Sequence, residues 1–113
     1  MESFVIDASG EIKCKSPRNG EDFSLQELND AVKGYIEIVP IKRNVGPFVF
    51  RYRNKRFEIK LTKDYVMVVN AEGKFETPDF NHIATLLATA SCSIMPDDWI
   101  AGNVLICASK MIK

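Results

Sequence analysis

The chain has 113 residues, 46% of them hydrophobic, and this length and composition predict one domain, residues 1–113, with one hydrophobic core. Its apolar runs fall short of the roughly 20 residues that cross a bilayer, and its start lacks the basic and apolar segments of a secretory signal, so we expect a cytoplasmic protein with no membrane partner. The 15 basic and 15 acidic residues give no net charge, but they are unevenly distributed.

The N-terminal part is predicted to form two strands and a helix. Phe4–Ile6 is a short apolar strand, and the turn after it sends Ile12–Lys15 back beside it as a hairpin. After a polar loop, Ser24 caps the first helical amides and Glu27 reaches back to it, which is the capping box that opens a helix. Gly34 is predicted to end this helix as a left-handed C-cap.

The basic residues are concentrated in the middle of the chain. Residues 42–63 contain eight basic residues and one acid, a local charge of +7. Residues 1–41 contain four basic and eight acidic residues (−4), and residues 64–113 contain three basic and six acidic residues (−3). This asymmetry predicts that the middle binds an anionic partner. DNA and RNA are less favoured than a phosphate-bearing small ligand or an acidic protein surface, because the acidic flanks would repel a long polyanion.

A β-hairpin is the clearest local pattern in this basic segment. Residues 48–52 and 57–61 alternate as two strands, and a two-residue turn at Asn54-Lys55 would place Arg51 opposite Glu58. One face is charged and the other is apolar, which predicts that the aromatic rings belong to the core and do not stack on bases. An anion would relieve the repulsion among the cations. The alternative is that they form only a solvated face that keeps a strand edge from aggregating.

The remaining segments complete an α+β pattern. Residues 35–39 alternate as a strand, and residues 65–70 are a dense apolar run that fits a central strand covered on both faces. A turn at residues 70–74 is expected to use the positive φ of its asparagine and glycine. The last strand, residues 100–108, is interrupted at Gly102-Asn103.

A second helix is predicted from about residue 80 to residue 90, with Asp79 or Asn81 as its cap. Its buried side should comprise Ile83, Leu86, Leu87 and Ala90. We therefore predict an α+β fold, with a mostly antiparallel sheet, two helices and a basic hairpin.

Four segments resemble a known family. They are Gly34–Val39, Val68–Lys74, Asn81–Thr85 and Ile100–Ile106, which together cover roughly residues 30–108. The family consists of small uncharacterised domains encoded by short open reading frames of bacteriophages, prophages and other mobile elements. Its members pass from the first of these segments to the second by a shorter link, so residues 44–63 are interpreted as an inserted basic hairpin.

The resemblance implies two roles that need no catalysis. One is to sequester a nucleotide-like anion and so counter host defence, and the other is to dock on a host protein; a DNA-binding accessory role is a third alternative. For sequestration, Arg51, Arg53 and Arg56 would hold phosphates, and neutral polar contacts would come from Asn70, Asn81 and Thr85. Capping and turn formation are the alternative roles of these last three residues.

Trp99 and Tyr35 are the candidate interface residues. Trp99 follows two aspartates, and tryptophan is enriched at binding hot spots, although it would equally fit as a core residue at the start of the last strand. A homo-oligomer is compatible with either role.

Catalysis, metals and cofactors are not expected. His82 with Asp79, or Cys92 activated by His82, are the candidate catalytic pairs, and no phosphate-binding or hydrolase motif accompanies them. His82 is the only histidine, and the three cysteines lack C-x-x-C spacing, which is typical of reduced thiols.

Overall fold

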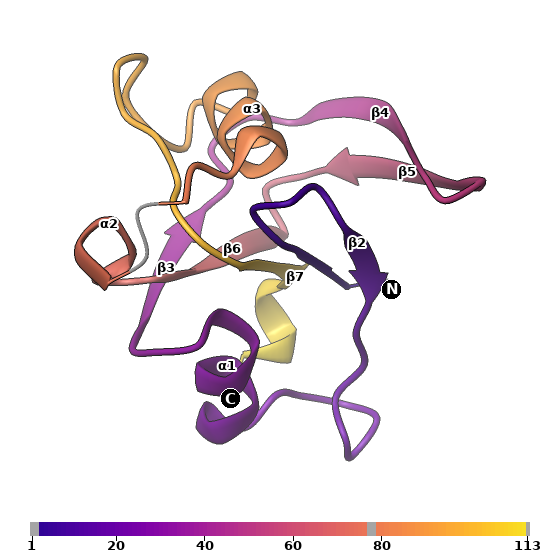
Figure 1. The fold of residues 1–113 in the computed structure, drawn as a ribbon. Coiled ribbons are helices and arrows are strands. Elements are labelled where there is room, and N and C mark those ends of the chain that lie inside the picture. The colour runs from indigo at the N-terminus through magenta and orange to yellow at the C-terminus, as the bar shows by residue number, and fades with distance from the viewer. Residues whose placement is uncertain (1–2, 77–78, 113) are drawn as a thin grey trace.

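A computed structural model describes residues 3–76 and 79–112 (Figure 1). The strands are β1 (Phe4–Ile6), β2 (Ile12–Cys14), β3 (Ile36–Pro40), β4 (Val45–Tyr52), β5 (Lys55–Leu61), β6 (Tyr65–Asn70) and β7 (Val104–Ala108). The helices are α1 (Leu25–Val32), α2 (Gly73–Glu76), α3 (His82–Ala90) and a short 3-10 turn, η1 (Ser109–Met111). The predicted α+β fold is confirmed, with α1 and α3 as its two main helices.

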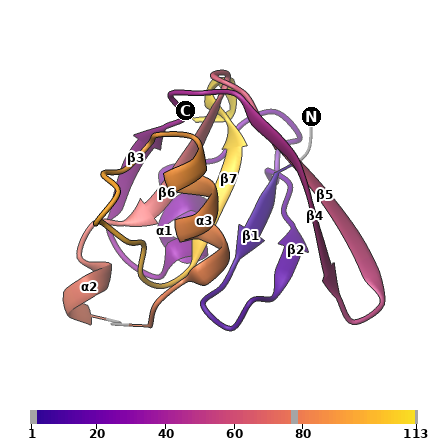
Figure 2. The same ribbon diagram turned by 90° about the horizontal axis from the view of Figure 1, so that it is seen from above.

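Five strands form one antiparallel sheet in the order β2-β1-β7-β6-β3. The predicted opening hairpin is therefore present, and the last strand lies in the middle of the sheet. β6 is buried on both faces over nearly its whole length, as its continuous apolar sequence predicted. β4 and β5 pair only with each other and stand apart from this sheet (Figure 2).

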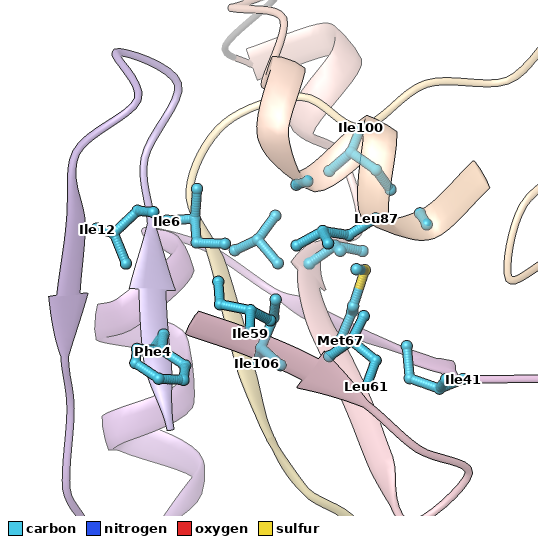
Figure 3. Close-up of a cluster of buried hydrophobic side chains, with 14 residues drawn as sticks. Phe4, Ile6, Ile12, Ile41, Ile59, Leu61, Met67, Leu87, Ile100 and Ile106 are labelled. Carbon is cyan, nitrogen blue, oxygen red and sulfur yellow. The ribbon is translucent and has the colours of Figure 1, made fainter. Parts of the chain in front are cut away.

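The sheet is covered on both faces (Figures 1 and 2). One face packs against α1, and its cluster comprises Phe23, Leu28, Val32, Val66, Val68, Leu105, Cys107, Ala108 and Met111. The other face packs against α3 and the β4–β5 hairpin, and Figure 3 shows its cluster, which includes Phe4, Ile6, Ile12, Ile59, Leu61, Met67, Leu87 and Ile106. Side chains alternate between the two clusters along β6 and β7, because successive residues of a strand point to opposite faces.

The two ends of α1 differ in how well they were predicted. The capping box is confirmed, since Ser24 and Glu27 each accept the other's backbone N–H. The C-cap prediction is wrong, because Lys33 and not Gly34 adopts the left-handed conformation, with φ 60°. Gly34 is required for another reason: a Cβ there would lie 2.6 Å from Nδ2 of Asn70.

α3 begins at His82 with Asn81 as its cap, which confirms one of the two predicted caps. The predicted buried side is wrong at Leu86, whose side chain is 50% exposed, while Ala84 and Ala88 are fully buried. The helix presents its small residues to the sheet, so it packs closely. The turn at residues 70–74 also differs from the prediction, because Gly73 begins α2 and has no positive φ.

The hairpin register differs from the prediction by one residue at the turn. The turn residues are Arg53 and Asn54, with φ values of 49° and 65°. Phe50 therefore lies opposite Phe57, and Arg51 lies opposite Arg56 instead of Glu58. Phe50 and Phe57 both pack against the core, and the preference of asparagine for a turn did not distinguish the two registers. Both registers put the same residues on each face, so the predicted apolar and charged faces are confirmed.

No helix in the described ranges is long and apolar enough to span a membrane.

Candidate functional site

The three predicted anion-binding arginines are divided between two surfaces of the hairpin. Arg51 and Arg56 face each other on the exposed side, where the guanidinium of Arg56 lies 3.2 Å from the carboxylate of Glu58. Arg53 lies in the turn, and its guanidinium carbon is 5.3 Å from the centre of the Tyr52 ring. The three therefore do not form one phosphate-binding cluster.

Arg53 instead lines a groove between the hairpin and β2, which we call the hairpin groove. It has a volume of about 500 Å³. Its lining residues are Glu11, Ile12, Lys13 and Cys14 on one side and Tyr52, Arg53, Lys55 and Phe57 on the other. Figure 1 shows how the groove arises, since the hairpin extends beside β2 without joining its sheet.

The hairpin groove combines positive charge with aromatic surface. Its cations are Lys13, Arg53 and Lys55, and its acid, Glu11, lies 3.3 Å from the ammonium of Lys13. Three basic residues and one acid leave a local charge of +2. Amines and guanidinium groups donate charge-assisted hydrogen bonds to phosphate or carboxylate oxygens, and such bonds are stronger than neutral ones.

The two aromatic residues of the groove differ in their contacts, and Phe57 packs against the core. Phe57 meets Phe4 edge to face, with ring centres 6.3 Å apart and planes at 84°. Tyr52 is half-buried on the same hairpin face and carries the Arg53 guanidinium on its ring. The groove therefore has aromatic surface beside its cations, which is the composition of a site for an anion with an apolar part.

The predicted neutral contacts have structural roles. Nδ2 of Asn70 donates to the carbonyls of Val32 and Lys33, at 3.3 and 3.5 Å, and so joins the end of α1 to β6. The hydroxyl oxygen of Thr85 accepts the backbone N–H of Ile100 at 3.0 Å. These residues do not line the hairpin groove.

Asn81 is the most completely engaged of the three. Its side chain has no exposed surface. Nδ2 donates to the carbonyls of Ile6 and Gly102 at 2.9 and 2.8 Å, and Oδ1 accepts the N–H of Ala84 at 3.0 Å. Asn81 therefore also fixes the start of α3 to the end of β1 and to the segment just before β7.

Trp99 lies in a separate aromatic cluster. Its half-buried ring stacks on Phe80, with ring centres 5.5 Å apart and planes at 16°. The ammonium of Lys74 lies 5.2 Å from the ring centre and pairs with Asp98. This hydrogen bond from Lys74 lowers the pKa of the Asp98 carboxyl. Trp99 also lines a smaller cavity of about 150 Å³ that does not share residues with the hairpin groove.

Tyr35, the other predicted interface residue, is 74% exposed just before β3. Two of the candidate catalytic residues, His82 and Cys92, lie at opposite ends of α3. The His82 ring packs on Phe80, 4.6 Å between centres, and Cys92 is exposed after α3 with φ 58°. Within residues 3–76 and 79–112, no group of three or more His, Cys, Asp or Glu side chains is arranged to hold a metal ion.

No protein-family model, curated protein or solved structure matches this chain. The resemblance to phage domains and the interpretation of residues 44–63 as an insertion therefore remain predictions. Function is inferred from the geometry of the hairpin groove.

Sequence reasoning missed part of this groove. Lys13 and Cys14 lie about 30 positions before the hairpin in the sequence, and nothing local indicates that they meet it. Lys55 was assigned to the turn, and Tyr52 was assigned only to the core. The signal available in the sequence was the basic character of residues 42–63, which contain two of the groove's three cations, Arg53 and Lys55.

Proposed function

We propose that this chain is a non-catalytic binding protein that captures an anionic, nucleotide-like small molecule in its hairpin groove. The observation that carries the proposal is the meeting of Lys13, Arg53 and Lys55 beside two aromatic rings in one groove of about 500 Å³. Small-molecule sites commonly have volumes of about 300–1,000 Å³, mostly apolar walls and a few polar groups that fix the ligand. Phosphate oxygens would bind the cations, and the planar part of the ligand would lie against Tyr52 and Phe57.

The expected affinity is moderate. A hydrogen bond to a charged group contributes about 1.5–3 kcal/mol, and stacking of a base on an aromatic ring contributes about 1–3 kcal/mol. Two such hydrogen bonds and one stacked ring therefore amount to about 4–9 kcal/mol, which corresponds to dissociation constants from millimolar to about micromolar. In a phage-infected cell, a protein of this kind would act by lowering the free concentration of a signalling nucleotide.

The test is a titration of the purified chain with mononucleotides, dinucleotides, cyclic nucleotides and inorganic phosphate, followed by calorimetry and thermal unfolding. The groove variant is Arg53→Gln with Lys55→Gln. The matched control is Arg51→Gln with Arg56→Gln, which removes the same charge from the other face of the same hairpin. We expect at least a tenfold loss of nucleotide affinity in the groove variant and less than a threefold loss in the control.

Two results would overturn the proposal. If no nucleotide binds the folded parent protein, the groove is not a nucleotide site. If both double variants lose affinity equally, the binding is a diffuse effect of hairpin charge. An affinity for long DNA that falls steeply with salt would favour the nucleic-acid alternative instead.

A further inference from the structure

β2 is an outer strand of the five-stranded sheet and pairs with β1. Two backbone bonds define which of its groups face β1: Lys15 N–H donates to Ser3 at 2.9 Å, and Asp7 N–H donates to Glu11 at 3.0 Å. Hydrogen-bonded and non-hydrogen-bonded pairs alternate along an antiparallel ladder. The N–H and C=O groups of the residues between, Ile12 and Cys14, therefore point away from β1 toward the open edge.

The hairpin extends along this open edge without pairing with it. Figure 2 shows β4 and β5 on the side of β2 that is remote from β1. Ile12 is buried in the cluster that contains Ile59 and Leu61 of β5, so the hairpin covers the face of the sheet to which Ile12 points. The hairpin groove thus lies where a sixth strand would be added to the sheet, with the hairpin over one face of that strand.

The charges around this position select the kind of strand that fits. Glu11, Lys13 and Lys15 stand at alternate positions and share one face of β2, and Lys13 also lines the hairpin groove. Arg53 and Lys55 lie at the tip of the hairpin. A second copy pairing antiparallel through its own Ile12 and Cys14 would oppose Lys13 to Lys13 and Lys15 to Glu11, so it would bring no excess of acid to these cations. An acidic strand would be attracted from both sides.

We propose that the open edge of β2 binds an extended acidic peptide segment of a partner protein by strand addition. Main-chain hydrogen bonds to Ile12 and Cys14 would supply affinity, and alternate side chains would supply specificity. On one side, acidic side chains would meet Lys13 and Lys15. On the other, apolar side chains would lie under Tyr52 and Phe57. The inference rests on the proposed function in that both place an anionic group in the hairpin groove, but it adds a second class of occupant.

The probe is an acetylated and amidated octapeptide in which Glu alternates with Val, compared with one in which Lys alternates with Val. Binding to the full chain is measured by fluorescence polarisation. We expect the acidic peptide to bind at least tenfold more tightly than the basic one. Lys13→Gln with Lys15→Gln, which removes the cations that the acidic side chains would meet, should weaken binding of the acidic peptide at least tenfold.

Backbone pairing has its own signature. In an added strand, alternate N–H groups point to β2 and the others point to solvent. N-methylation of one alternate set of the peptide should therefore abolish binding, whereas N-methylation of the other set should leave it within about threefold. On the protein side, Cys14→Pro should weaken binding at least tenfold, and its matched control, Cys14→Ala, should not. Proline is tolerated at this position because the N–H it removes faces the open edge.

Each outcome decides the inference. Loss of binding with one methylated set and with Cys14→Pro supports strand addition. Equal effects of both methylated sets overturn strand addition, although they leave anion capture in place. Binding of nucleotides without binding of the acidic peptide also overturns it, and the proposed function then stands. If neither nucleotides nor the acidic peptide bind, both the proposed function and the strand-addition inference are overturned. Concentration-dependent dimerisation of the parent, lost in Cys14→Pro, would assign the edge to a second copy and overturn the acidic partner.

Discussion

Replacement of Asn81 by alanine tests whether this residue acts in the fold or in ligand binding. The side chain is fully buried and makes three hydrogen bonds, two as a donor to the carbonyls of Ile6 and Gly102 and one as the acceptor that caps α3. Alanine removes all three bonds. It also leaves two carbonyl groups without their amide donor in a part of the molecule that water does not reach.

The expected loss can be worked out from these bonds. Loss of an asparagine N-cap costs about 1 kcal/mol, and a buried group left without its partner costs about 1–3 kcal/mol. With two carbonyls near the lower part of that range, Asn81→Ala should lower the free energy of unfolding by about 3–5 kcal/mol. This is a large fraction of the roughly 5–15 kcal/mol that stabilises a typical domain. At about 4 °C per kcal/mol, the melting temperature should fall by roughly 12–20 °C.

The measurement is urea unfolding, with two further variants. Asn103→Ala is the matched control, because this side chain makes no hydrogen bond within the described residues, and it should change stability by less than about 0.5 kcal/mol. Asn81→Asp keeps a good cap but points a carboxylate at two carbonyl oxygens, so it should be at least as destabilising as alanine. A stable Asn81→Asp would refute the bridging role. A stable Asn81→Ala that had lost nucleotide binding would restore the ligand role predicted from sequence.

Two further predictions concern titratable groups. Backbone N–H groups of Ser24 and Arg18 donate hydrogen bonds to the Glu27 carboxylate and lower its pKa. This carboxylate therefore stabilises the fold at pH values above its unfolded-state pKa. The stabilisation is lost as the pH falls through its folded-state pKa. Glu27→Gln should therefore unfold at lower urea at pH 7 and show a flatter loss of stability below about pH 4.3; equal acid profiles would contradict this. Burial raises the pKa of the Cys107 thiol to about 11, while Cys14 and Cys92 are exposed. Mass spectrometry after maleimide treatment should find two rapidly modified cysteines and a third modified only in denaturant, and rapid modification of Cys107 in the folded protein would refute the assigned burial.

Local hydrogen bonding and side-chain periodicity made several features predictable from sequence. The capping box at Ser24 and Glu27 depends on residues three positions apart, so its pattern is visible without a fold. The burial of β6 follows from its unbroken apolar sequence. The two faces of the hairpin were also predictable despite the wrong register, since both registers keep the alternation of side chains.

Contacts between distant segments decided the rest. Asn81 bonds to Ile6 across 75 positions, and no local pattern indicates that its amide would have partners there. Gly34 is needed beside Asn70, not as a left-handed cap, because α1 and β6 approach closely. The candidate site depends on the same kind of contact. The sequence by itself determined that the hairpin is basic and two-faced, because charge and alternation are local properties. Only the tertiary structure decided that the hairpin lies beside β2, because the burial of its apolar face against a remote part of the chain sets its position.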